Sequence, residues 1–191
     1  MHSHIIGIDE VGRGPIAGPI VVGAVCIPNS ITWENVPTLK DSKKLTEKKR
    51  EAWYQWVVAQ VDIHWAIAEV SAERIDIIGI TAAGNEAARS ALQKLMRSPK
   101  TTKVLLDYGL RVGDEWSQTA LIKGDEKEVA IALASIMAKV TRDKYMMHMA
   151  EQYPNYGFAQ HKGYGTKMHY ESIKKNGLCT LHRRCFLKGL H

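Results

Sequence analysis

Short apolar segments alternate along the chain with longer segments in which apolar side chains recur every three or four positions. The short segments predict β-strands at 4–8, 20–27, 61–70, 103–106 and 119–122. The longer segments predict helices at 46–61, 71–96, 126–149 and 167–175, with Thr46 as the N-cap of the first. This order of elements indicates an α/β fold with a mixed sheet flanked by helices. The short link between the first two strands favours an antiparallel pair.

The chain has 191 residues, and we expect residues 1–191 to form one domain, with a helical and loop-rich segment at about 150–191. No apolar run approaches the roughly 18 residues of a membrane span, and no signal peptide is apparent. Three cysteines, Cys26, Cys179 and Cys185, are better explained as reduced thiols than as a disulfide framework or a metal site. We therefore expect a cytoplasmic protein with no membrane partner, and a monomer because no heptad pattern demands a partner.

Positive charge is unevenly distributed along the chain. The net charge is +6, and lysines and arginines gather at 40–50 and in the last thirty residues. Such clusters are compatible with a polyanionic partner, although solvated surfaces explain them equally well before any motif is considered.

Carboxylates stand where three predicted strands end. They are Asp9 with Glu10, then Asp107, then Asp125. Strand ends of an α/β sheet converge on one rim, and carboxylate oxygens are ligands for Mg²⁺ or Mn²⁺. Two such ions about 4 Å apart can activate a water and stabilise the leaving oxygen in phosphodiester cleavage. The sequence thus predicts a metal-dependent hydrolytic site at this rim.

Each acid also has a structural explanation. Asp125 and Glu128 match a capping box at the start of a helix, Asp107 could open a turn, and Asp9–Glu10 could be an exposed turn pair. Asp143 is expected to form a salt bridge. Neighbouring strand residues point to opposite faces, so Asp9 and Glu10 can share a site only if the strand ends or bends between them.

The glycine-rich stretch that follows Glu10 fits no nucleotide-binding fingerprint. Gly12-Arg13-Gly14-Pro15 lacks the G-x-G-x-x-G spacing, and no helix pattern opens behind it. Its bare backbone can approach a ligand closely, and its arginine can bind a phosphate. A ribose 2′-hydroxyl both donates and accepts, so adjacent amides and carbonyls can recognise it.

Six segments resemble, in order and spacing, the bacterial ribonuclease HII family: GIDEVGRGPIAGPIVVGAV, DSKKLTEKKRE, LLDYG, KGDEKEVAIALASIMAKVTRD, YGFAQHKGYGTKMH and LHRRCF. The resemblance covers about Ile5 to Phe186. It implies a ribonuclease H-like fold with a C-terminal helical part over a nucleic-acid groove. It also implies an endonuclease that cuts RNA joined to DNA in a duplex, including a single ribonucleotide within DNA.

The resemblance implies a role for each motif residue. The metal-binding and catalytic carboxylates would be Asp9, Glu10, Asp107 and Asp125, holding two Mg²⁺ or Mn²⁺ ions during catalysis. Tyr164 would stack on the sugar of the next deoxynucleotide; without the family it would be an ordinary surface tyrosine. The other implied substrate contacts are Gly12, Arg13, Gly14, Lys43 and Lys162. No histidine is required, so His161, His169 and His182 are expected at the surface or at phosphates.

The match has departures and rivals. The family's Val-Asp-Gly is Leu106-Asp107-Tyr108-Gly109 here, which could alter how Asp107 meets a metal. Ribonuclease HIII shares the acidic core but typically adds an N-terminal domain, for which the early first strand leaves no room. A non-catalytic hybrid-binding protein predicts a missing carboxylate, and a small-substrate phosphatase predicts a nucleophilic Asp-x-Asp motif.

Overall fold

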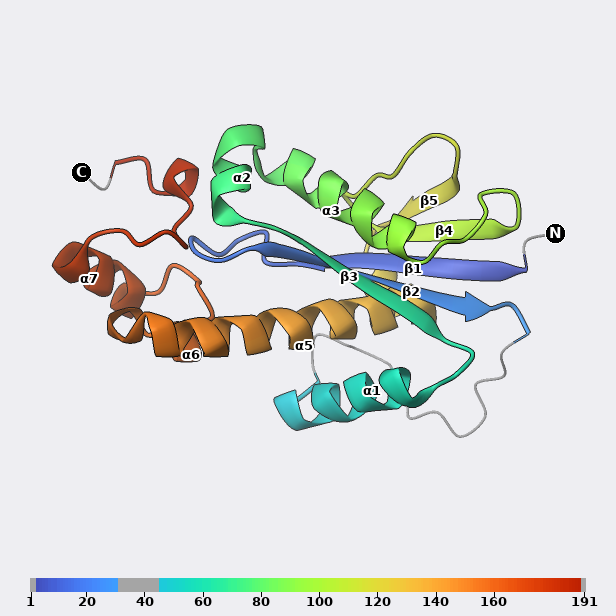
Figure 1. Ribbon diagram of the computed structural model, residues 1–191, viewed down its shortest axis with the longest axis horizontal. Helices are drawn as coiled ribbons and strands as arrows, with labels where there is room; N and C mark the ends of the chain where they lie inside the picture. Colours follow the sequence, from blue (N-terminus) through green and yellow to red (C-terminus); the bar gives the residue numbers. More distant parts are fainter. Residues whose placement is uncertain (1–2, 31–44, 190–191) are drawn as a thin grey trace.

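The computed structural model describes residues 3–30 and 45–189, and its centre is a five-stranded sheet (Figure 1). The strands lie in the order β3-β2-β1-β4-β5. They are β1 (His4–Val11), β2 (Ile20–Pro28), β3 (His64–Val70), β4 (Thr102–Asp107) and β5 (Ser117–Leu121). The first three pair antiparallel, and β4 and β5 run parallel to β1. The mixed sheet and the antiparallel first pair confirm the predictions.

Helices cover both faces of the sheet. On one face lie α5 (Val129–Gln152) and α1 (Glu47–Ala59), and on the other lie α2 (Ala72–Ile78) and α3 (Ile80–Lys94) (Figure 1). Helix α5 approaches the sheet closely because two strand positions carry no side chain. A Cβ on Gly7 would lie 2.1 Å from the carbonyl carbon of Ala130, and one on Gly23 would lie 2.3 Å from the carbonyl oxygen of Ala134. The two glycines thus fix where α5 crosses β1 and β2, beside the carboxyl end of β1.

The single helix predicted at 71–96 is wrong, because the structure has two. Gly79 adopts φ 79°, in the left-handed region that favours glycine, and it ends α2 before α3 begins. The cap predicted for the first helix is confirmed, since the Thr46 hydroxyl accepts a hydrogen bond from the Lys49 amide at 3.4 Å. Within residues 3–30 and 45–189, no helix is both long and apolar enough to cross a membrane.

The C-terminal segment packs at the end of the sheet where β1 stops (Figure 1). It contains η2 (Pro154–Tyr156), α6 (Phe158–His161), α7 (Lys167–Asn176) and η3 (Arg184–Phe186). Main-chain hydrogen bonds tie it to the loop between β1 and β2. The Ile16 amide donates to the Gly163 carbonyl at 2.9 Å, and the Gly18 amide donates to the Leu181 carbonyl at 2.8 Å. Residues distant in sequence are thereby brought to one end of the sheet.

Candidate active site

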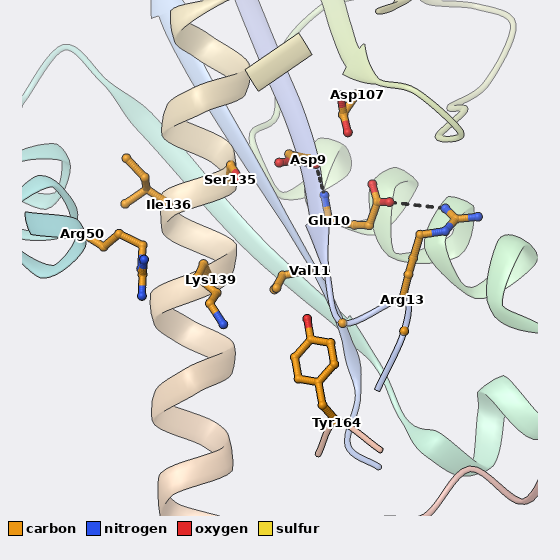
Figure 2. A pocket seen from close by; sticks show the side chains of 12 residues that line it. Asp9, Glu10, Val11, Arg13, Arg50, Asp107, Ser135, Ile136, Lys139 and Tyr164 are labelled. Atoms are coloured by element: carbon orange, nitrogen blue, oxygen red, sulfur yellow. Dashed lines mark hydrogen bonds and ion pairs between the residues drawn. The ribbon is translucent and has the colours of Figure 1, made fainter. Parts of the chain in front are cut away.

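Three carboxylates meet at the carboxyl ends of β1 and β4. One oxygen from each of Asp9, Glu10 and Asp107 lies within 4.8 Å of the others, which defines the acidic cluster (Figure 2). The register explains the meeting, because the β1–β4 ladder ends at the pair Ile8–Leu106 and each next residue is an acid. Three of the four predicted metal ligands are therefore close together.

Asp9 and Glu10 share this cluster although the strand does not end between them, contrary to our expectation. Both stay paired with β2, as does Val11 after them. The Asp9 side chain instead folds back along the chain, and its Oδ1 accepts a hydrogen bond from the Glu10 amide at 2.7 Å. The two acids thus share the cluster within a strand whose pairing with β2 is uninterrupted, and a hydrogen bond holds the Asp9 side chain against the next amide.

The acidic cluster holds ionisable groups where water is scarce. The pKa of Asp9 is raised to about 8, chiefly by burial; the charges of Glu10 and Asp107 add to this, and a hydrogen bond from the Ser135 hydroxyl opposes it. Burial also raises the pKa of Glu10, and the charge of Arg13 opposes that shift. Among the described residues, the buried Oε2 of Glu10 finds no hydrogen-bond partner. A divalent cation would stabilise the ionised forms and give this oxygen a partner.

Asp125, the fourth predicted metal ligand, is not part of the acidic cluster in the structure. It is 2% exposed within the short helix α4 (Gly124–Lys127), and the preceding Gly124 amide donates to Asp107 Oδ1 at 2.9 Å. The capping-box explanation is wrong, because α5 starts at Val129 with Glu128 as its N-cap and without a side-chain capping bond. Asp125 thus neighbours Asp107 through one peptide but is not among the three clustered carboxylates.

A cleft of about 420 Å³ opens beside the acidic cluster. Figure 2 shows Glu10 and Arg13 on one side, α5 on the other, and Tyr164 below them. The lining residues are Asp9, Glu10, Val11, Gly12, Arg13, Gly14, Arg50, Asp107, Ser135, Ile136, Lys139 and Tyr164. Most of the predicted site residues therefore line one cleft.

The predicted substrate residues take different positions around it. Arg13 bonds to Glu10 Oε1 at 3.3 Å and to the Thr81 hydroxyl at 3.3 Å. A Cβ on Gly14 would lie 3.9 Å from the Tyr164 ring. Lys162 does not line the cleft, since its ammonium donates to the Ala159 carbonyl. Lys43 lies outside the described residues.

Gly12 has two reasons to be glycine. Its φ is 95°, and a Cβ there would lie 2.8 Å from the Pro19 carbonyl oxygen and 2.5 Å from Arg142 Nε. Residues 12–19, here called the glycine loop, therefore need a position without a side chain at their start.

Two buried arginines, which sequence reasoning missed, hold the glycine loop. Arg183 is 0% exposed and donates to four loop carbonyls at 2.7–3.1 Å, those of Gly12, Arg13, Pro15 and Gly18. Arg142, also 0% exposed, donates to the carbonyls of Ala17, Pro19 and Lys162 at 2.9–3.0 Å. The loop conformation thus depends on α5 and on the C-terminal segment.

Sequence reasoning also missed Ser135, Lys139 and Arg50 as cleft residues. A signal existed for the first two, because positions four apart share one face of a helix. The same spacing continues to Asp143, which forms the expected salt bridge, with Lys139 Nζ at 2.8 Å. The surface placement of three histidines is wrong: His161, His169 and His182 are 8%, 0% and 3% exposed.

Comparisons with known proteins give one family. The family description "Ribonuclease HII" matches residues 6–188. A ribonuclease HII of Bacillus cereus is 45% identical over 184 residues, covering 96% of this chain and 69% of the relative. A ribonuclease HII of Bacillus thuringiensis has the same identity and coverage.

Solved structures agree on the fold. The crystal structure of ribonuclease H2 from Pyrococcus horikoshii has a TM-score of 0.75 at 27% identity, covering 95% of this chain and 93% of that one. The crystal structure of a ribonuclease HIII (Bst) in complex with Mn²⁺ has a TM-score of 0.72 at 19% identity, covering 97% of this chain and 65% of that one. At this identity the likeness supports the fold but not the activity. These likenesses confirm the predicted ribonuclease H-like architecture.

The family match spans nearly all of the chain, and it includes the strand ends that carry the acidic cluster, the glycine loop and the C-terminal segment that holds it. The chain therefore belongs to the ribonuclease HII family and is an endonuclease of the ribonuclease H type, acting on RNA–DNA hybrids.

Proposed function

We propose that this protein hydrolyses the phosphodiester bond 5′ to a ribonucleotide, both in RNA–DNA hybrid and at a ribonucleotide within duplex DNA. Its products carry 5′-phosphate and 3′-hydroxyl ends, and its role is to remove ribonucleotides from DNA. One observation carries the proposal: the acidic cluster, Gly12–Gly14 and Tyr164 line the same cleft. A group that cuts and groups that can recognise a ribose thus face one substrate.

Asp9, Glu10 and Asp107 would hold Mg²⁺ or Mn²⁺, with Asp125 as a fourth ligand beside Asp107. The fit rests on the buried Glu10 Oε2 that lacks a hydrogen-bond partner and on an all-oxygen donor set. When bound, two such ions supply activation of a water and stabilisation of the leaving 3′-oxygen. A ribonuclease HIII with this fold has been crystallised in complex with Mn²⁺, which is consistent with that metal.

Recognition of the ribonucleotide falls to the glycine loop and Tyr164. The backbone of Gly12 and Gly14 can approach a 2′-hydroxyl because no side chain intervenes. Arg13 lies 37% exposed beside Glu10, where it can meet the adjoining phosphate. The Tyr164 ring, 43% exposed at the cleft, offers a face on which the next deoxyribose can stack.

Positive side chains around the cleft would provide affinity that does not depend on sequence. Lys139 and Arg50 line it from α5 and α1. Lys167, Lys174 and Lys175 extend the positive charge along α7. Such contacts release counterions from nucleic acid and make binding sensitive to salt. We propose that the protein binds its duplex as a monomer, with Lys162 and Lys43 as further phosphate contacts.

The test is a labelled DNA duplex with one ribonucleotide, incubated with the protein and Mg²⁺ or Mn²⁺. Asp9→Asn serves beside it, with Asp62→Asn, at an exposed aspartate outside the cleft, as a carboxylate control. We expect one nick 5′ to the ribonucleotide, abolished by Asp9→Asn and kept by Asp62→Asn. Cleavage of long hybrid without a nick at the single ribonucleotide would contradict the junction role of Gly12–Gly14 and Tyr164. Equal activity of the Asp9→Asn variant would contradict the catalytic site.

A further inference from the structure

Three buried histidines pack together behind the loop that carries Tyr164. His161 ends α6, His169 lies in α7 and His182 precedes η3. The rings of His161 and His169 stack with centroids 4.2 Å apart, and those of His169 and His182 lie 5.2 Å apart. Phe158 packs edge-on against the first two rings. The three histidines, here called the histidine cluster, have no part in the activity proposed above.

Hydrogen bonds fix the proton positions on two of the rings. The Cys179 amide can only donate, so His182 Nδ1, at 2.9 Å, accepts. The His182 proton is then on Nε2, which donates to His169 Nε2 at 3.1 Å. His169 therefore carries its proton on Nδ1, which donates to the Tyr164 carbonyl at 2.9 Å. A chain of neutral imidazoles thus ends on the main chain of Tyr164.

His161 holds the other side of the same loop. The Gly163 amide donates to His161 Nδ1 at 3.1 Å, so the ring proton is on Nε2 and donates to the Tyr156 carbonyl at 2.7 Å. The Gly163 carbonyl in turn accepts from the Ile16 amide at 2.9 Å, within the glycine loop. The peptides on both sides of Tyr164 are therefore anchored, and one of them also anchors the glycine loop.

We infer that the histidine cluster positions Tyr164 against the glycine loop, with His169 as the positioning residue that holds the Tyr164 carbonyl. The inference rests on the proposed function, because it takes Tyr164 to be the residue that contacts the sugar beside the ribonucleotide. Three hydrogen bonds of the network need a neutral acceptor ring: those from the Gly163 amide to His161, from His182 to His169 and from the Cys179 amide to His182. A second proton on any of the three rings would face one of these N–H donors.

Acid should therefore disrupt the histidine cluster. The pKa of His169 is lowered to about 4, chiefly by burial and further by the charges of His161 and His182. Because the unfolded chain takes up protons near pH 6.5 and the folded chain resists them, stability falls as the pH drops from 6.5 toward 4. Tyr156 of η2 and Cys179 after α7 contact the His182 ring, and the charge of Lys162 acts on His161. Arg183 follows His182 in the chain, and the Arg142 guanidinium of α5 donates to the Lys162 carbonyl.

Two substitutions at His169 separate positioning from packing. His169→Phe keeps a ring of similar shape but cannot donate to Tyr164, whereas the amide nitrogen of His169→Asn can take the place of Nδ1. We expect His169→Phe to slow single-turnover cleavage of the ribonucleotide-containing duplex about tenfold, and His169→Asn to stay within about threefold of wild type. His148→Phe, at an exposed histidine of α5, should leave the rate unchanged. Thermal melts select an assay temperature at which every variant is folded.

A double substitution tests whether His169 acts through Tyr164. In a Tyr164→Ala background, His169→Phe should slow cleavage by less than about twofold, since the ring that it positions is gone. A tenfold slowing that persists in this background, or a full rate for His169→Phe alone, overturns the inference.

Amide hydrogen exchange measures the local stability of the backbone around Tyr164 and needs no nuclease activity. His169→Phe should speed amide exchange of the peptide covering 162–166 about tenfold and leave the β1 and β2 peptides unchanged. Unchanged exchange at 162–166 overturns the positioning role even if the enzyme is active. Faster exchange in a protein whose wild type does not cut the duplex keeps the positioning role and contradicts the proposed function instead.

Discussion

The acidic cluster and the glycine loop line the same cleft, but the buried charged groups of the two regions differ in how fully the chain itself hydrogen-bonds them. In the acidic cluster, burial raises the pKa of Asp9 and Glu10, and an oxygen of Glu10 has no hydrogen-bond partner among the described residues. Behind the glycine loop, the guanidiniums of Arg142 and Arg183 each donate to three or more main-chain carbonyls.

The difference separates the part of the site that needs a ligand from the part that is complete within the chain. Buried charges are costly unless they are paired or hydrogen-bonded. The arginines meet that requirement with backbone oxygens, so they serve the fold. The carboxylates meet it only in part, since one oxygen of Glu10 has no hydrogen-bond partner among the described residues and burial raises the pKa of Asp9, so an added cation would stabilise their charged forms. Substitutions in the two regions should therefore separate activity from stability.

Asp9→Asn should have the largest effect on activity and almost none on stability. The amide keeps the shape of the side chain and can still accept from the Glu10 amide, but it removes a negative ligand. We expect single-turnover cleavage to fall on the order of 1,000-fold, about 4 kcal/mol, with a melting temperature close to that of wild type. Quenched-flow cleavage and calorimetry measure the two quantities. A large loss of stability would show that Asp9, like Arg142 and Arg183, supports the fold, and would contradict the proposed difference between the two regions.

Arg183→Met, in contrast to Asp9→Asn, should strongly reduce the stability of the fold. It leaves four loop carbonyls without their donor, and we expect unfolding to become easier by about 3 kcal/mol or more in urea melts. Arg184→Met, at the exposed neighbouring position, is the matched control and should change stability by less than about 0.5 kcal/mol. Similar values for both variants would refute the structural role of Arg183.

Divalent cation should stabilise the wild type through the acidic cluster. At a Mn²⁺ concentration 100 times the dissociation constant, binding adds about 2.7 kcal/mol, seen as a rise in melting temperature. Glu10→Gln should reduce the rise, because it weakens the cluster at its unpartnered oxygen. Glu73→Gln, an exposed carboxylate in α2, should keep it. If Glu10→Gln leaves the Mn²⁺-induced rise in melting temperature unchanged, the metal binds outside the acidic cluster.

Lys139→Met should have the smallest effect. Lys139 lines the cleft from α5, and loss of one phosphate contact reduces the slope of log K against log salt by about one. Lys94→Met, on α3 across the sheet, should leave the slope unchanged. Fluorescence anisotropy with a labelled duplex at several salt concentrations measures both, and equal slopes for wild type and Lys139→Met would remove Lys139 from the interface.

The sequence predicted those parts of the site that depend on strand ends. Asp9, Glu10 and Asp107 follow apolar segments directly, and adjacent strands carry such residues to one edge. It did not predict that Asp9 and Glu10 meet within a strand that stays paired with β2, where Asp9 Oδ1 accepts from the Glu10 amide. The helix break at Gly79 depends on a positive φ that a periodic pattern does not reveal.

The side chains that hold the glycine loop and the Tyr164 main chain depend on contacts between distant segments. Arg183 bonds to loop residues about 170 positions away, and His182 bonds to His169 across a turn of the C-terminal segment. An arginine is rarely buried, and a histidine beside lysines is ordinarily exposed, so composition alone pointed to the surface. Pairings of this kind emerge only when the C-terminal segment is folded onto the glycine loop.

We propose that the acidic cluster holds divalent cations against the phosphate 5′ to a ribonucleotide. The direct test replaces one non-bridging oxygen of that phosphate with sulfur, in each of its two diastereomers. Because sulfur binds Mg²⁺ poorly and Mn²⁺ better, we predict that at least one diastereomer is cut about tenfold or more slowly with Mg²⁺ and that Mn²⁺ restores its rate. Equal slowing of both diastereomers in both metals, with the unmodified duplex cut normally, would contradict a cation at the scissile phosphate.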